Sequence, residues 1–93
     1  MIMKENDVIS IVTTVGEFVG KYVSVDPIAV TVKDPRMVMH NKEGMGFNPG
    51  ISMTGKSEPD QVEFYITNVV FFGETSEPVK NAYLQFTSGI VLP

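Results

Sequence analysis

Residues 8–15 constrain the fold of this chain more than any other segment. They read Val-Ile-Ser-Ile-Val-Thr-Thr-Val, and every residue except Ser10 is branched at Cβ. Branched side chains lose rotamer freedom in a helix but pack well on a pleated strand. The segment therefore predicts a β-strand. A chain of 93 residues is long enough to enclose one core, so we expect a single β-rich domain over residues 1–93.

A second strand is expected directly after the first. Gly16 is the expected turn residue, and the segment from Glu17 to Val25 places apolar side chains on both faces of a strand. Gly20 lies inside this segment, where a glycine usually marks a bulge or a sharp bend. We therefore expect the second strand to bend at Gly20, as the strands of a small barrel must.

A third strand is expected after a tight corner at Asp26-Pro27, because Asp and Pro favour turns for backbone reasons. Residues 28–33 alternate between apolar side chains and small, polar or charged ones, which is typical of a strand. We expect this strand to continue to Met39, with a kink at Asp34-Pro35.

The second half of the chain is expected to hold a long loop and two more strands. Hydrophobic periodicity vanishes over residues 40–60, where glycines and prolines predict a long flexible loop. A fourth strand is expected from Val62 to Phe72 and a fifth from Ala82 to Leu92, and no segment predicts a helix. Five strands with glycines at bends predict an all-β fold, a small five-stranded barrel of the SH3-like or OB-like type.

The composition favours a binding protein over an enzyme. The chain has no cysteine and a single histidine, His40, so thiolate sites, cysteine nucleophiles and histidine clusters for metals are excluded. We expect no catalytic site, no metal and no cofactor. No segment has the apolar run of a signal peptide or a membrane span, so we expect no membrane partner and a cytoplasmic location.

The run from Gly20 to Val32 reads Gly-Lys-Tyr-Val-Ser-Val-Asp-Pro-Ile-Ala-Val-Thr-Val and follows Thr14-Val15-Gly16-Glu17. It resembles the first sequence motif of the Sm and Sm-like proteins, and within them the bacterial RNA chaperone Hfq, in its glycine-to-aspartate spacing. The resemblance implies a five-stranded SH3-like barrel of the Sm type whose copies form a homo-oligomeric ring. The chain also looks like Sm-like proteins carried by marine tailed phages, which implies the host cytoplasm for a phage-encoded chain.

Two segments compete for the second motif of that family, which joins an arginine and a glycine at the end of the fourth strand. If the motif is the segment from Val69 to Gly73, enough chain remains for a fifth strand. If it is Thr87 to Val91, the expected strand from Val62 to Phe72 has no place among the five strands. We favour the first segment because it gives five strands. In both segments the arginine is absent, because its position holds Phe72 or Ser88.

The resemblance implies a pocket for single-stranded RNA at the pore of the ring. By position, the pocket would be formed by Asp26, Pro27, Ile28, Phe72 and Gly73. Two observations from the residues weigh against it. Asp-Pro is more often only a turn former, and a net charge of −4 weakens attraction to a polyanion. The cations that could form a basic rim are Lys33, Arg36, Lys42 and Lys56. Scattered charges of both signs are more often part of an ordinary solvated surface.

An apolar strand edge predicts self-assembly, because an uncovered apolar edge is an aggregation hazard. The expected interface is formed by Val69, Val70, Phe71, Phe72, Ile90 and Val91. The alternative is that the residues from 69 to 72 pack under the long loop. The sequence thus predicts a ring-forming Sm-like protein that binds single-stranded RNA or a protein partner. The competing hypotheses are a structural or assembly module of a phage or its host, which pairs strand edges without RNA, and an OB-fold binder.

Overall fold

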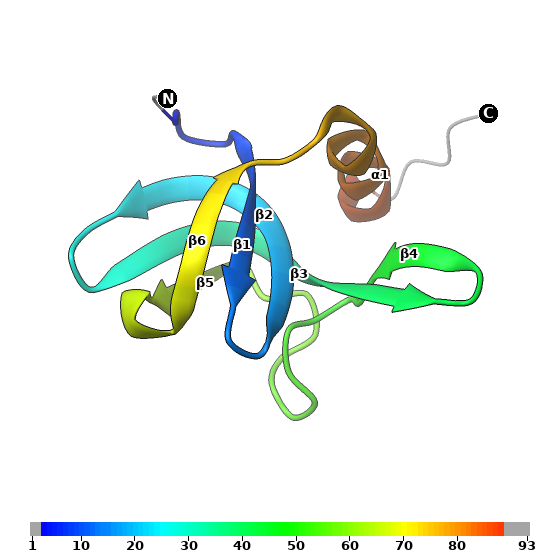
Figure 1. The fold of residues 1–93 in the computed structure, drawn as a ribbon, viewed down its shortest axis with the longest axis horizontal. Helices are drawn as coiled ribbons and strands as arrows, with labels where there is room; N and C mark the ends of the chain where they lie inside the picture. The colour runs from blue at the N-terminus through cyan, green and yellow to red at the C-terminus, as the bar shows by residue number, and fades with distance from the viewer. Residues whose placement is uncertain (1–2, 89–93) are drawn as a thin grey trace.

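The computed structural model describes residues 3–88, and antiparallel strands make up most of it (Figure 1). The elements follow the chain in the order β1 (Val8–Thr13), β2 (Gly16–Val25), β3 (Ala29–Asn41), β4 (Gly44–Phe47), β5 (Gln61–Tyr65), the 3₁₀ helix η1 (Ile66–Asn68), β6 (Val69–Glu74) and α1 (Glu77–Ser88). The expected all-β character is confirmed for residues 3–74, and a helix follows. No helix in residues 3–88 is long and apolar enough to cross a membrane.

The sheet has the strand order β4-β3-β2-β1-β6, and β5 also pairs with β3. The long strand β3 serves two partners on one edge: its first part, residues 29–33, pairs with β5, and its end, residues 38–41, pairs with β4. Among the described residues no pairing joins β5 to β6, so the sheet is not closed. Two strands that are adjacent in sequence therefore lie at opposite ends of the sheet, linked by η1.

The irregularity expected at Gly20 is present, but the extra residue belongs to the partner strand. Val19 pairs with Arg36 and Lys21 with Lys33, so two residues of β3, Asp34 and Pro35, lie opposite Gly20 and the bulge is in β3. A Cβ atom at this position would lie 3.2 Å from the carbonyl oxygen of Lys33 and 3.2 Å from Cβ of Val32. A larger residue here would require its neighbours on β3 to move by a few tenths of an ångström, so the close approach of β2 and β3 favours glycine.

The first hairpin turns one step earlier than expected. Gly16 does not form the turn; it begins β2 and pairs with Thr13, so the turn is formed by Thr14 and Val15. The Thr13 hydroxyl closes this turn, because it donates a hydrogen bond to the Gly16 carbonyl at 2.8 Å and accepts one from the Val15 amide at 3.2 Å. Gly16 has a φ of 153°, which explains why glycine stands here.

The third strand is confirmed and continues through the expected kink to Asn41. Asp34 has a φ of 52°, and its amide donates to the carbonyl of Asp60 at 2.8 Å. The loop expected over residues 40–60 is wrong in its first part, because β3 and β4 form a hairpin over residues 38–47 that projects from the body (Figure 1). The asparagine side chain of Asn41 fixes the hairpin turn by accepting from the Glu43 amide at 2.8 Å.

The expected fourth strand is two strands. The segment from Val62 to Phe72 is interrupted by η1, which sends β5 to the β3 edge and β6 to the β1 edge. The periodicity of Val62, Phe64 and Ile66 correctly indicated a strand, but three residues with no glycine or proline form the break. Tertiary pairing rather than local propensity decides this break.

The expected fifth strand from Ala82 to Leu92 is also wrong, because residues 77–88 form α1 and residues 89–92 lie outside the described part. Glu77 and Pro78 suit the first turn of a helix. Amide groups in this turn have no partner within the helix, so the missing N–H of proline costs nothing there. The carboxylate of Glu77 is stabilised by the positive end of the helix dipole. Tyr83 is the buried residue of α1, and Val79, one turn earlier, packs beside it.

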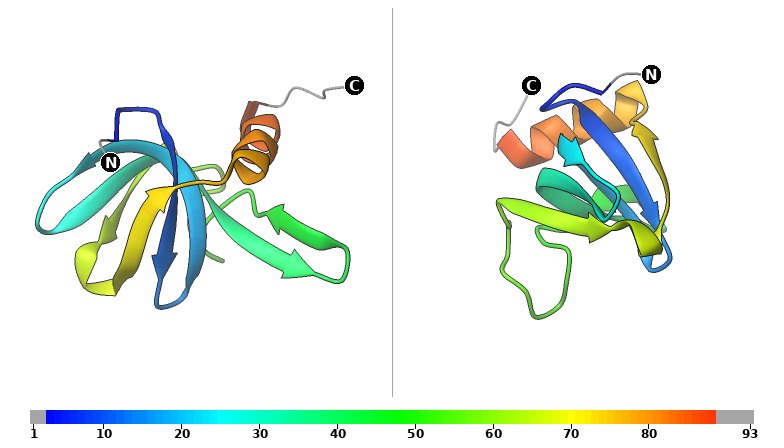
Figure 2. Two further views of the ribbon diagram at one scale, coloured as in Figure 1. Left: turned by 45° about the horizontal axis from the view of Figure 1, so that its top comes forward. Right: turned by 90° about the vertical axis from the view of Figure 1, so that its left-hand side faces the viewer.

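Two apolar clusters cover the two faces of the sheet. The inner cluster lies on the concave face and contains Ile9, Ile11, Phe18, Val30 and Val32, with Met3, Tyr22, Met37, Ile51, Phe64, Ile66, Val69 and Phe72 packed against it. The outer cluster lies between the opposite face and α1 and contains Val8, Val19 and Tyr83, with Val38, Phe47 and Val79 around them. Figure 2 shows α1 crossing one end of the sheet and leaving the other end of the outer face bare.

Candidate functional site

Strand β6 is an edge of the sheet. On one side it pairs with β1 from Ile9–Glu74 to Thr13–Val69. On its other side no described strand pairs with it. An edge strand presents a row of unused amide and carbonyl groups, and natural proteins protect such edges with lysine, proline or a covering segment. Strand β6 reads Val-Val-Phe-Phe-Gly-Glu and contains neither lysine nor proline.

A bulge in β6 turns two apolar side chains outward. Val12 pairs with Phe71 and Thr13 with Val69, so the register shifts and Val70 has no partner on β1. Val70 is 64% exposed and Phe71 61% exposed, whereas Val69 and Phe72 pack against the inner cluster. Of the predicted interface residues on β6, two therefore face solvent and two face the core. The other two, Ile90 and Val91, lie outside the described residues.

The residues predicted for RNA binding fall into two separate places. Asp26, Pro27 and Ile28 form the corner between β2 and β3, at the far left of Figure 1. Phe72 and Gly73 lie on β6, opposite Ile11 and Ser10 of β1. Ile11 in turn pairs near the start of β2, whereas the corner follows its last residue. The described structure does not bring the two groups together.

Asp26 holds the corner by its side chain. Its Oδ1 atom accepts hydrogen bonds from the amides of Ile28 at 2.7 Å and Ala29 at 2.9 Å, and its own amide donates to the Ala29 carbonyl at 3.0 Å. These two amides stabilise the carboxylate and lower the pKa of Asp26 below its ordinary value of 3.8. The turn-forming role of Asp26 is thus present in the structure.

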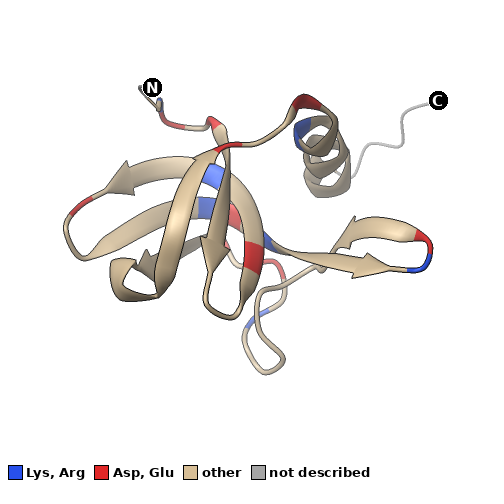
Figure 3. Ribbon diagram, in the orientation of Figure 1, with Lys and Arg blue, Asp and Glu red and all other residues tan. Residues whose placement is uncertain are grey.

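Positive charge is absent from both places. No lysine or arginine occurs over residues 22–32 or 61–74. Lys4 precedes β1, and Figure 3 shows further cations on the middle of the sheet, on the hairpin of β3 and β4, in the loop before β5 and on α1. Lys21 and Lys33 lie opposite each other on β2 and β3, and Glu5 pairs with Lys33 at 3.3 Å. Phosphate contacts supply most of the affinity of proteins for nucleic acid, so neither place has the usual electrostatic basis for it.

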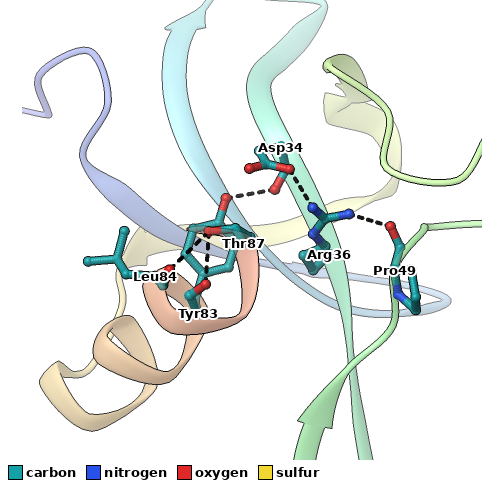
Figure 4. Close-up of polar contacts among 6 residues, drawn as sticks. All are labelled: Asp34, Arg36, Pro49, Tyr83, Leu84 and Thr87. Carbon is teal, nitrogen blue, oxygen red and sulfur yellow. Dashed lines mark hydrogen bonds and ion pairs between the residues drawn. The ribbon is translucent and has the colours of Figure 1, made fainter. Parts of the chain in front are cut away.

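A polar cluster under α1 was not recognised from the sequence. The Arg36 guanidinium is buried, contacts the Asp34 carboxylate at 2.7 Å and donates to the Pro49 carbonyl (Figure 4). It also lies 5.7 Å from the Phe86 ring. The Tyr83 hydroxyl donates to the Asp34 carbonyl at 2.6 Å. The cluster ties α1 and the loop before β5 to β3. The sequence does carry a signal for the helix above this cluster, because Val79, Tyr83 and Phe86 recur at helical spacing. We had expected the segment from Ala82 onward to be a strand.

Side chains that could bind a metal ion do not gather in the described part of the chain. No group of three or more histidine, aspartate or glutamate side chains in residues 3–88 lies close enough to hold a metal ion. A cavity of about 330 Å³ opens between the first hairpin and β5. Its walls are mainly apolar and include Phe18, Ile51 and Phe64, with Tyr65 also lining it. This cavity marks the open seam of the sheet beside β5.

Comparison with known proteins gives no relative from which a function could be transferred. No protein-family model, no curated protein and no solved structure matches this chain.

Proposed function

We propose that this protein is a self-assembling β-domain that forms a homo-oligomer through the open edge of β6. The observation that carries the proposal is the exposure of Val70 and Phe71, 64% and 61%, on a strand that has no partner on its outer side. Such an edge favours pairing with another chain. The bulge at Val70 adds apolar side chains to the unused backbone groups at the same place, so one contact would cover both.

The form of the assembly follows from the two open edges. Strand β6 ends the sheet on one side, strands β4 and β5 end it on the other, and these edges are different surfaces. A contact between different surfaces is head to tail and must either close into a ring or continue as a filament. The strand order, the irregular pairing at Gly20 and the resemblance of residues 20–32 to the Sm motif support a ring of Sm-like SH3-like barrels.

Single-stranded RNA is the second candidate, as a ligand of the assembled protein. It is favoured by the exposed aromatic ring of Tyr65, 60% exposed, on which a base could stack. The absence of lysine and arginine over residues 22–32 and 61–74 makes it the weaker candidate. A labelled uridine-rich or adenine-rich oligonucleotide should be retarded at low salt, with affinity falling steeply as salt rises. No retardation at micromolar protein would remove RNA from the proposal.

The assembly is tested with the substitution Phe71→Asp. A carboxylate at the edge would have to be desolvated on pairing, so we expect the variant to have the 10.2 kDa mass of a single chain in size-exclusion light scattering. Met53→Asp is the matched control, because Met53 is fully exposed in the loop before β5 and the charge change is the same. The control should keep the wild-type mass, and both variants should keep the wild-type circular dichroism. An unchanged mass for Phe71→Asp rules out the β6 edge.

A further inference from the structure

The open seam of the sheet holds a cavity that the proposed self-assembly does not use. Its volume of about 330 Å³ lies within the range of small-molecule sites, about 300 to 1,000 Å³. The first hairpin, the loop before β5, β5 itself and the junction of η1 with β6 all contribute to its walls. Val70 and Phe71 are not among the lining residues, so the cavity is a separate surface from the outward side chains of β6.

Aromatic and aliphatic side chains form much of the cavity wall. The rings of Phe18 and Phe64 both line it, and their centroids are 5.0 Å apart with the planes tilted by 57°. Val62 is on the same face of β5 as Phe64, because side chains alternate along a strand. Ile51 adds an aliphatic side chain from the loop. Paired aromatic rings favour a further ring placed edge to face or offset, so the wall suits a ring-bearing ligand.

Backbone hydrogen bonds hold the cavity open in the absence of a ligand. The Thr14 amide donates to the Asn68 carbonyl at 3.0 Å, which ties the turn of the first hairpin to η1 at the same end of the sheet (Figure 1). The Thr13 hydroxyl closes that turn. The Met37 amide donates to the Gly50 carbonyl at 3.4 Å, next to Ile51 in the loop. A preformed site lowers the entropy cost of binding.

Unused backbone groups lie along the β5 side of the cavity. The Asp60 carbonyl and the Ile66 amide, just outside the two ends of β5, both bond toward β3. Backbone groups of alternate residues in an antiparallel strand point to the same side, so those of Glu63 and Tyr65 point away from β3. Both residues line the cavity. Each therefore offers a ligand one amide donor and one carbonyl acceptor.

The charge of the lining restricts the ligand. Glu63 is the one charged residue among the described residues that line the cavity. No lysine or arginine occurs over residues 5–20 or 61–74, which supply the hairpin and strand walls. An anion that entered would lose its water and find a carboxylate but no cation, which is costly. Carboxylates, phosphates and nucleotides are therefore poor ligands for this site.

We propose that the cavity binds a small uncharged aromatic molecule that carries a hydrogen-bonding group. Its ring would pack against Phe18 and Phe64, and its polar group would meet the free backbone of Glu63 or Tyr65. The basis is the coincidence, in one preformed cavity, of an aromatic wall, unused backbone groups and the absence of positive charge. This inference does not rest on the proposed self-assembly, because the two proposals use different side chains.

The first test compares two probes that share a ring system, indole and indole-3-carboxylate, which is an anion at neutral pH. Two-dimensional NMR of the ¹⁵N-labelled wild-type protein should show saturable shifts with indole for the amides of Thr14, Glu63, Tyr65 and Val69. A ligand of this size should have a Kd of about 1 mM, and the carboxylate should bind at least about tenfold more weakly. Equal affinity for the two probes, or no saturable shift at about 10 mM indole, would overturn the proposal.

The second test fills the cavity with Val62→Phe. The larger ring has space beside β5, so the variant should keep the wild-type circular dichroism and lose indole affinity at least about tenfold. Val25→Phe is the matched control, because Val25 is 43% exposed at the end of β2 and does not line the cavity. The control should bind indole as the wild type does. A folded Val62→Phe that keeps the wild-type affinity would place indole elsewhere and contradict the proposal, and the comparison of the two probes stands without any variant.

Discussion

The outer face of the sheet has two ends that differ in what covers them. At one end, α1 covers Val8 and Val19, and Tyr83 is completely buried between them. At the other end, Val70 and Phe71 extend into solvent with more than half of their surface exposed. Both ends carry apolar side chains of similar size. The difference is that α1 of the same chain covers one end, whereas no described segment covers the other, where we propose that a second copy of the chain binds.

Removal of the internal cover should have the largest effect. Tyr83→Ala would leave a cavity between α1 and the sheet and remove the hydrogen bond to the Asp34 carbonyl. Replacing a fully buried aromatic residue by alanine costs about 3 to 5 kcal/mol of the free energy of unfolding. Urea denaturation of the variant and the wild type at equal protein concentration measures this loss. A loss below about 1 kcal/mol would show that α1 is not needed to cover the outer cluster.

The strands whose pairing is local were predictable, and the elements decided by distant contacts were not. Residues 8–25 are rich in branched side chains, and Gly20 correctly indicated the irregular pairing with β3, where any Cβ would meet Lys33 and Val32. The break at η1 carries no local signal, since Ile66, Thr67 and Asn68 are compatible with a strand. Only the pairing of β5 with β3 and of β6 with β1 separates the two strands.

The helix was hidden by its composition. Residues 82–87 contain Tyr83, Phe86 and Thr87, which are common in strands, and the apolar run 90–92 follows them. The signal that was present is Pro78 in the first turn, a usual position of proline in a helix. Thr87 fits the helix because its hydroxyl donates to the Tyr83 carbonyl at 2.9 Å.

The candidate site was predictable as a segment but not in its orientation. The apolar run from Val69 to Phe72 was recognised from the sequence, yet alternation alone cannot show which of four apolar residues face outward. The bulge opposite Val12 and Thr13 decides it, by turning Val70 and Phe71 to solvent. Tyr65 was not recognised because the end of β5 was hidden inside one long expected strand.

Loss of the proposed contact at Phe71 should have an intermediate effect, and it should change how the urea midpoint depends on protein concentration. If a second copy covers Phe71, assembly is linked to folding and the urea midpoint of the wild type rises with protein concentration. Phe71→Asp should make the midpoint independent of concentration, because the monomer already exposes this side chain. A dilution series of both proteins in urea measures this. A wild-type midpoint that does not change with protein concentration would contradict the proposal that a second copy covers Phe71.

The smallest expected effect concerns the ionisation of Tyr83, the buried tyrosine between α1 and the sheet. Burial, aided by the Asp34 carboxylate, raises the pKa of Tyr83 above its ordinary value of 10.0. The folded chain then holds this proton more tightly than the unfolded chain, so the free energy of unfolding falls as the pH rises above 10.0. Tyr83→Phe should cost about 1 kcal/mol at neutral pH by losing one hydrogen bond. This difference from the wild type should shrink above pH 10.0 in parallel urea titrations; a constant difference would show that the phenol ionises freely.

The mass of the wild-type protein in solution tests the central claim most directly. Sedimentation equilibrium over a wide range of concentrations gives this mass without assuming a shape. A chain whose β6 edge is covered by a second copy should have a mass several times 10.2 kDa and dissociate on dilution. A mass of 10.2 kDa at every concentration would contradict the account, because Val70 and Phe71 would then be uncovered in the working protein.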